Sequence, residues 1–299
     1  MTLQQLRYAI EVADCRSVTQ AAQNLFITQP SLSSAVRQLE KETGITIFSR
    51  GSRGVLVTPE GEELLGYARL VVQQAALLED RYIAHQASRS RFAVSTQHYA
   101  FTAEAFVQLV KGHPDGDYEF TLRESRTLDI LNDVRTFRSE MGIIYLSSFN
   151  ETVLMRMLRE AGLQFEELFR ASPHIFIGRQ HPLAGKESVT LQELAPYPYL
   201  SYDQGEQSAP YFAEEVLSTV EHPRSIRVTD KGSIIDLMVG TEAYTIATGA
   251  CPSYLRGDAI VSIPLDVEEI IRVGVITRQD YKPTPLGALY LQILHSLVT

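Results

Sequence analysis

The chain has 299 residues, of which 44% are hydrophobic and 21% charged. This length suits two domains, and the composition is that of a globular protein that buries a sizeable core. No run of about 18 apolar residues occurs, which argues against a membrane-spanning helix. Residues 1–7 are polar and lack the apolar stretch of a signal peptide, so we expect a cytoplasmic protein.

The net charge of −9 is unevenly distributed along the chain. Residues 1–58 hold six basic and four acidic side chains, so the rest of the chain carries the whole negative excess. A mildly basic head on an acidic body is typical of a protein that touches nucleic acid only at one end.

The two cysteines, Cys15 and Cys251, lie far apart and lack the spacing of a metal site. We therefore expect two ordinary buried thiols rather than a redox pair.

Three helices and two short strands are predicted in residues 1–58. Apolar residues recur at helical spacing in residues 3–14, Ser17 caps a second helix over 18–25, and a third runs from Gln29 to Thr43. Gly44 ends the third helix, and the strands are predicted at Ile45–Phe48 and Val55–Val57. Two helices joined by a tight turn and followed by a strand pair predict a winged helix-turn-helix domain.

The third helix has the pattern of a helix that enters the major groove of DNA. Gln29, Ser33 and Arg37 share one face, while Leu32, Val36 and Leu39 form the opposite, buried face. The predicted DNA-contacting residues are Thr28, Gln29, Pro30, Ser31, Ser33, Ser34 and Arg37 on the helix, with Arg50 and Arg53 on the wing. The helical pattern by itself also fits a small helical domain with a solvated polar face.

Residues 59–88 are predicted to form a long linker helix, which opens at Pro59-Glu60-Gly61. Apolar residues recur at alternating spacings of four and three, as in a coiled coil, at Leu64, Ala68, Val71, Ala75, Leu78 and Tyr82. This stripe indicates pairing of two subunits. The alternative is that it packs on the chain's own domains.

Strands and helices alternate from Phe92 to the end of the chain. Strands are predicted at 92–95, 118–122, 142–146, 174–178, 199–202, 225–229 and 270–276, and helices at 101–110, 128–137 and 286–297; the segments 234–239 and 244–248 complete the series. This rhythm predicts α/β architecture with mostly parallel sheets.

The amino-terminal sixty residues resemble the signature of LysR-type transcriptional regulators. The resemblance rests on Ala21–Leu25, Gln29–Ser33, Leu39-Glu40, Gly44, Phe48–Arg50 and Thr58–Gly61, with Arg179–Ala184 as a later feature. It departs at Glu242–Ile246, where many relatives carry Gly-Leu-Gly-Ile. The identity of the effector therefore cannot be transferred.

The resemblance implies a fold, a function and partners. The expected regulatory region, residues 91–299, has two Rossmann-like α/β lobes shaped like a periplasmic binding protein. Lobe I would cover about 91–161 and 266–299, and lobe II about 162–265. The implied protein binds double-stranded operator DNA and a small-molecule effector, and it forms homodimers or homotetramers through the linker helix. RNA polymerase is a further candidate partner.

The candidate effector residues lie where predicted strands end. Thr96, Gln97 and His98 stand between a strand and a helix start, where free N–H groups and the helix dipole suit an anion, and the family places its effector at the matching turn. Helix capping is the alternative role for these residues. Further candidates are Ser125, Tyr202, Gln204 and Thr248, with Glu124 beside Ser125. We expect a small anionic metabolite.

Two other classes of protein share parts of this pattern. A solute-binding protein has the same two-lobed region, but it needs a signal peptide and has no use for residues 1–58. An α/β enzyme with an accessory helical domain needs a catalytic constellation, and no Ser/His/Asp order or metal-ligand cluster stands out. We therefore predict no catalytic residue, no metal and no cofactor.

Overall fold

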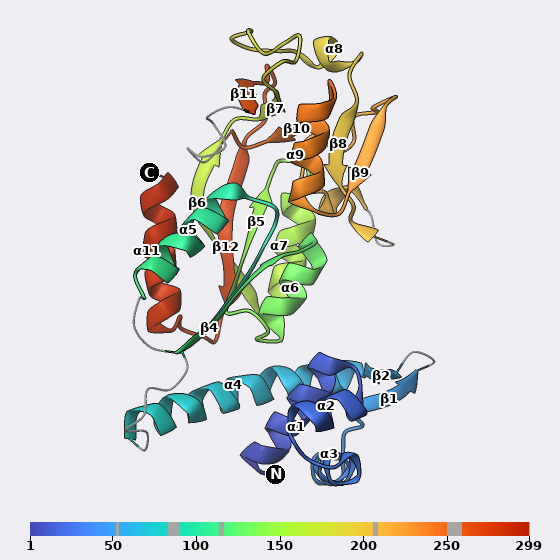
Figure 1. The fold of residues 1–299 in the computed structure, drawn as a ribbon, viewed down its shortest axis with the longest axis vertical. Coiled ribbons are helices and arrows are strands. Elements are labelled where there is room, and N and C mark those ends of the chain that lie inside the picture. The colour runs from blue at the N-terminus through green and yellow to red at the C-terminus, as the bar shows by residue number, and fades with distance from the viewer. Residues whose placement is uncertain (52–53, 83–89, 114–116, 206–208, 250–258, 299) are drawn as a thin grey trace. The chain divides into compact units, whose positions relative to one another are not determined.

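The computed structural model describes residues 1–51, 54–82, 90–113, 117–205, 209–249 and 259–298. The chain divides into two compact units. The first holds residues 1–90 with two short later segments, and the second holds most of the rest (Figure 1).

The first unit begins with three helices, which are α1 (Leu3–Cys15), α2 (Val18–Asn24) and α3 (Gln29–Thr43). Thr2, Ser17 and Thr28 each precede one of these helices, and each side chain accepts a hydrogen bond from a backbone N–H of the first turn. Such bonds satisfy donors that have no partner inside the helix. The apolar face of α3 is buried as predicted, with Leu32 and Leu39 fully enclosed and Val36 nearly so.

A two-stranded antiparallel hairpin follows, with β1 at Phe48–Gly51 and β2 at Gly54–Val57. The prediction of a first strand at Ile45–Phe48 was wrong, because β1 begins at Phe48. The carboxylate of Glu40 in α3 explains the shift. It accepts hydrogen bonds from the backbone N–H groups of Ile47 (2.8 Å) and Phe48 (3.1 Å), so these donors of the chain before β1 are bound to the helix.

The long helix α4 (Pro59–Tyr82) divides the predicted stripe into two parts. Leu65 and Ala68 are buried in a cluster that includes Leu6 and Ala9 of α1, so the first turns of α4 pack on the chain's own helices. Farther along, Val71 is 46% and Leu78 is 61% exposed. The side chain of Tyr82 lies outside the described residues.

The second unit contains two five-stranded sheets. The first sheet has the order β4-β3-β5-β12-β6, with β3 at Ser90–Thr96, β4 at Tyr118–Glu124, β5 at Met141–Leu146, β6 at Leu163–Ala171 and β12 at Ile271–Arg278. The second has the order β11-β7-β10-β8-β9, with β7 at His174–Gly178, β8 at Tyr199–Tyr202, β9 at Ser225–Val228, β10 at Tyr244–Ala247 and β11 at Ile260–Pro264.

Both sheets are mixed, so the prediction of mostly parallel sheets was wrong. Strand β12 runs antiparallel to both β5 and β6, and β7 runs antiparallel to both β10 and β11. These are the strands at which the chain passes between the sheets, from β6 to β7 and back from β11 to β12. Because β6 belongs to the first sheet, the first crossing falls after Ala171 rather than near residue 161.

Helices cover both faces of the first sheet (Figure 1). One face carries α5 (Ala100–Lys111) and α11 (Pro285–Val298), and the other carries α6 (Thr127–Arg135) and α7 (Glu151–Glu160). Alternate residues of β5 accordingly enter different clusters, Ile143 with Leu109 of α5 and Ile144 with Ile130 of α6. The second sheet is covered by α9 (Lys231–Gly240), and a short helix, α8 (Leu191–Leu194), precedes β8.

Candidate functional site

The polar face of α3 is open to solvent. Gln29, Pro30, Ser31, Ser34 and Arg37 are exposed, and Ser33 is half-buried. The Thr28 hydroxyl lies 2.8 Å from that of Ser31 and accepts a bond from the Ser31 backbone N–H. The seven predicted residues thus lie between the N-cap residue Thr28 and Arg37 in the middle of α3.

The wing is described only in part. Arg50 lies in β1, but its side chain and the whole of Arg53 lie outside the described residues. The hairpin itself is held beside α3 by the Glu40 bonds described above, which gives the two elements a fixed relation within the first unit.

A cavity of about 90 Å³ lies in the second unit between the two sheets. Its first-lobe wall includes His98, Tyr99 and Tyr145, and the second lobe supplies an apolar wall that includes Phe176 and Ile234. A second hollow of about 220 Å³ adjoins it, because His98 and Tyr202 line both. A small, mostly apolar cavity with a few polar groups is typical of a ligand site.

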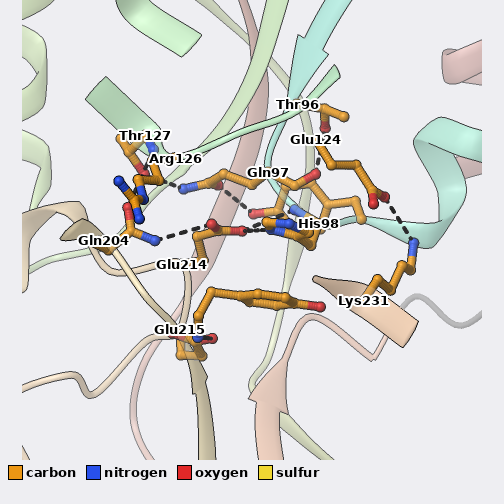
Figure 2. A network of polar contacts seen from close by, with 12 residues as sticks. Thr96, Gln97, His98, Glu124, Arg126, Thr127, Gln204, Glu214, Glu215 and Lys231 are labelled. Atoms are coloured by element: carbon orange, nitrogen blue, oxygen red, sulfur yellow. Dashed lines mark hydrogen bonds and ion pairs between the residues drawn. The ribbon is translucent and has the colours of Figure 1, made fainter. Parts of the chain in front are cut away.

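The polar contacts around His98 connect the two lobes (Figure 2). One oxygen of the Glu214 carboxylate accepts the His98 backbone N–H at 2.9 Å and lies 2.8 Å from His98 Nδ1. The other oxygen accepts a bond from Gln204 Nε2 at 3.1 Å. The His98 ring also stacks on Tyr202, with ring centroids 3.9 Å apart. The position that the sequence predicted for an external anion therefore holds a carboxylate of the chain itself.

Thr96 and Gln97 are buried framework residues, and neither lines the cavity. The Thr96 hydroxyl donates to the Gln97 carbonyl oxygen at 2.8 Å. The Gln97 side chain donates to the Thr127 hydroxyl and accepts from the Tyr145 N–H and the Tyr99 hydroxyl. The sequence found the correct turn but could not show that two of its three side chains point into the protein.

The loop after β8 bridges the lobes. Arg126 donates to the Asp203 carbonyl oxygen (3.0 Å) and carboxylate (2.7 Å), and Gln204 accepts the Thr127 N–H at 3.4 Å. Gly205 has a φ of +74°, and a Cβ built there would overlap Nη1 of Arg126. Glycine therefore satisfies both the backbone conformation and the approach of the guanidinium.

The remaining predicted residues, Ser125 and Thr248, line the hollow and the cavity respectively. The backbone N–H of Ser125 donates to the Thr96 carbonyl oxygen at 2.9 Å, which ties the two strand ends together. Nearby, Lys231 of α9 forms an ion pair with Glu124 at 3.3 Å, a further contact between the lobes (Figure 2).

The sequence interpretation missed the carboxyl pair Glu214-Glu215. Both side chains are buried and both line the cavity. Burial, followed by the neighbouring Glu214 carboxylate, raises the pKa of Glu215 to about 8. The sequence does contain a signal for this burial. The two adjacent acids lie between the apolar pairs Phe212-Ala213 and Val216-Leu217, and apolar neighbours on both sides favour a buried position.

The described ranges contain no group of three or more His, Cys, Asp or Glu that could hold a metal ion. The same ranges contain no helix with the length and hydropathy that a bilayer crossing requires.

Two family sequence models match the chain. Residues 3–62 match the bacterial regulatory helix-turn-helix protein, lysR family, and residues 80–298 match the LysR substrate binding domain. The uncharacterized HTH-type transcriptional regulator YnfL of Escherichia coli (strain K12) is 29% identical over 67% of this chain and 65% of that relative. The chain thus spans slightly less than two thirds of the length of that relative.

Solved structures share the fold. A full-length OxyR from Pseudomonas aeruginosa aligns with a TM-score of 0.66 at 20% identity and covers 100% of this chain and 94% of its own. CbnR in complex with its target DNA aligns with a TM-score of 0.57 at 18% identity and covers 99% and 100%. These likenesses confirm the predicted fold class of a helix-turn-helix domain followed by a two-lobed α/β region.

Proposed function

The chain belongs to the LysR family of bacterial regulatory helix-turn-helix proteins, and we propose that it is a transcriptional regulator controlled by a small metabolite. The observation that carries this proposal is the cavity between the two lobes, to which both lobes supply polar side chains. The match of residues 3–62 to a helix-turn-helix model speaks against a solute-binding protein and against an enzyme. A regulator of bacterial genes acts in the cytoplasm, where it binds its operator. RNA polymerase is a further proposed partner.

The proposed DNA contact is the exposed polar face of α3. Gln29 and Ser33 lie near the helix start and can reach base edges, while Arg37 is long enough to reach a phosphate or a base. Arg50 and Arg53 are proposed to bind the phosphate backbone from the wing. Loss of a phosphate contact weakens binding to all sequences alike and reduces the dependence of affinity on salt.

The proposed assembly is a homodimer or a homotetramer formed through α4. Val71 and Leu78 are exposed within the first unit and would be covered by a second copy of the helix. Changing both to Glu should reduce the mass measured by light scattering. Changing Leu65 instead should destabilise the subunit, because Leu65 is buried among the chain's own helices.

The ligand is proposed to act by binding one arrangement of the lobes better than another. A hundredfold preference corresponds to about 2.7 kcal/mol, which is in the range of allosteric coupling. The anionic effector expected from the sequence stays a prediction. At the His98 turn, such an anion would have to displace the Glu214 carboxylate.

The test is footprinting of operator DNA with and without candidate metabolites, guided by mass spectrometry of any ligand that purifies with the protein. Ala247→Phe places a ring in the cavity that Ala247 lines. We expect this variant to bind DNA normally and to ignore the metabolite. A metabolite response that survives in Ala247→Phe would place the effector elsewhere, and a protein without specific DNA binding would refute the regulator.

A further inference from the structure

The cavity is lined by two buried carboxyl groups, of which only one has a basic side chain beside it. Glu214 and Glu215 both line it. The side chain of Glu214 is only 4% exposed, and Glu215 as a whole residue is only 3% exposed. Glu214 contacts His98, but no Lys, Arg or His in the described part of the chain forms an ion pair with Glu215. The two nearby cations are already paired, Lys231 with Glu124 and Arg126 with Asp203.

Such an arrangement is costly for the protein alone. A buried carboxylate is stable only when a cation or several hydrogen bonds compensate for lost hydration, and otherwise it takes up a proton. The Tyr202 backbone N–H donates to the Glu215 carboxyl at 2.9 Å, and the backbone N–H groups of Glu214 and Glu215 also favour its charged form, but these bonds do not offset the burial. Accordingly, burial and the Glu214 carboxylate raise the pKa of Glu215 to about 8, so it is mostly protonated at neutral pH.

A second observation independently indicates a ligand. Thr245 of β10 lines the same cavity and is only 6% exposed, yet its hydroxyl makes no hydrogen bond within the residues that the structure covers. A hydroxyl that lines a cavity and has no protein partner is available to bond a polar group of a ligand.

The rest of the wall suits an organic cation with an apolar body. Aromatic faces attract ammonium groups, and Tyr145, Tyr202 and Phe176 line the cavity. The apolar members of the lining, which would contact the ligand body, are Val216, Ile234, Met238, Ile246, Ile260 and Ile271. A volume of about 90 Å³ restricts the ligand to a small molecule.

We propose that the effector carries a protonated amino group, which binds at Glu214 and Glu215 while its apolar body packs on the wall formed by the second sheet and α9. This inference rests on the proposed function of the cleft and adds the chemical class of the ligand. An amino acid also belongs to this class, with its carboxylate free to meet Lys231.

Binding of an ammonium group should release a proton from Glu215. The titratable groups that face Glu215 or share its cavity are Glu214, His98, Tyr99, Tyr145, Tyr199, Tyr202 and Lys231. Burial, followed by nearby carboxylates or tyrosines, raises the pKa values of the four tyrosines well above 10, so they stay protonated. Calorimetry at pH 7 in buffers of different ionisation enthalpy should therefore show net proton release with an amine.

The test uses the full-length protein and probes that share one carbon skeleton. Isopentylamine carries only an amino group, isocaproate carries only a carboxylate, and leucine carries both. Phenethylamine, hydrocinnamate and phenylalanine repeat this comparison with an aromatic body. We expect binding of at least one amino-bearing probe and no binding of the carboxylates. Glu215→Gln and Glu214→Gln should each weaken amine binding about tenfold or more, as expected for loss of a charged hydrogen-bond partner.

Glu221→Gln, an exposed acid in the same segment, is the matched control and should bind like the unchanged protein. Binding of the carboxylates alone, binding of none of the probes, or amine binding unchanged in both cavity variants overturns the inference. The proposed function survives each of these results if a metabolite of other chemistry still shifts the footprint and Ala247→Phe abolishes that shift.

Discussion

The proposed DNA-contacting surface and the cavity differ in how far apart along the chain their residues lie. On α3 the predicted contacts come from residues 28–37, whereas the cavity is lined by side chains from His98 to Ile271. The polar groups on α3 are also mostly exposed and free to meet a partner. At the cavity, Glu214 already bonds to His98 and, outside the lining, to Gln204.

This difference has a physical consequence. A partner of α3 meets a surface whose polar groups are hydrated, so each contact exchanges water for DNA with little change in the protein. A ligand of the cavity meets a buried network and must replace or extend existing bonds, which couples its binding to protonation and to closure of the lobes. Mutations in the two regions should therefore have different signatures.

The largest expected effect is a pH dependence confined to the second unit. The pKa of Glu215 lies above that of an ordinary glutamate, at about 8 compared with 4.5. The contribution of Glu215 to the free energy of unfolding is therefore fully present below about pH 4.5. It falls between about pH 4.5 and pH 8 and is constant at higher pH. The free energy of unfolding should fall by about 1.4 kcal/mol for each pH unit inside this window.

Urea unfolding at several pH values, followed by hydrogen exchange in each unit, measures this effect. Glu215→Gln should flatten the curve of the second unit and leave that of residues 1–58 unchanged. An equally steep curve in the variant would show that another group titrates. Glu140, whose pKa is raised by burial, is the first group to examine in that case.

The second effect concerns the preference of α3 for operator DNA over random DNA. The double variant Gln29→Ala, Ser33→Ala should lose about 1–3 kcal/mol of discrimination for each good base contact removed, with little change in stability. Competition binding with operator and random duplexes measures the ratio of affinities. Gln38→Ala, on an exposed part of the same helix, is the control. An unchanged ratio would mean that α3 does not read the sequence.

The sequence predicted the α3 region well because its signals are local. Thr28, Pro30 and Gly44 mark the ends of the helix, and the spacing of Leu32, Val36 and Leu39 defines its buried face. The first wing strand was misplaced because its start depends on Glu40, which reaches from the helix to backbone groups seven and eight residues later.

The cavity was predicted only in outline. Strand ends indicated His98, Tyr202 and Thr248, which do line it. Periodicity could not show that Gln97 is turned inward, because that depends on Tyr145 and Thr127 from other elements. Nor could it find Glu215, whose importance arises from contacts between distant segments. Mixed sheets were missed for the same reason, since strand direction is set by partners far away along the chain.

A third, smaller effect tests whether Gln97 is framework. Gln97→Met keeps the shape but leaves the buried Tyr145 N–H without its acceptor, so we expect a loss of about 1–3 kcal/mol in unfolding free energy. Gln164→Met, at an exposed hydrogen bond in β6, should change it by less than about 0.5 kcal/mol. Ligand affinity that collapses in a stably folded Gln97→Met protein would instead make Gln97 a direct contact.

The smallest effect concerns the bridge between Arg126 and Asp203. These side chains are 44% and 31% exposed, so solvent screens their attraction, and Arg126→Ala should cost less than about 1 kcal/mol. The loss should shrink further in high salt. Arg156→Ala, which removes an exposed pair with Glu160 far from the cavity, is the control for charge. Denaturant midpoints measure both.

Substitution of Gly205 separates the effect of the Arg126–Asp203 bridge from the effect of the backbone conformation at residue 205. Gly205→Ala is strained twice, by its φ of +74° and by the contact of the new Cβ with the Arg126 guanidinium. Removing Arg126 relieves the contact but not the φ strain, so the double variant should be more stable than the sum of the single losses predicts. Simple additivity would mean that the guanidinium moves aside freely. The lobes would then be held together mainly by the buried Glu214 network rather than by this exposed pair.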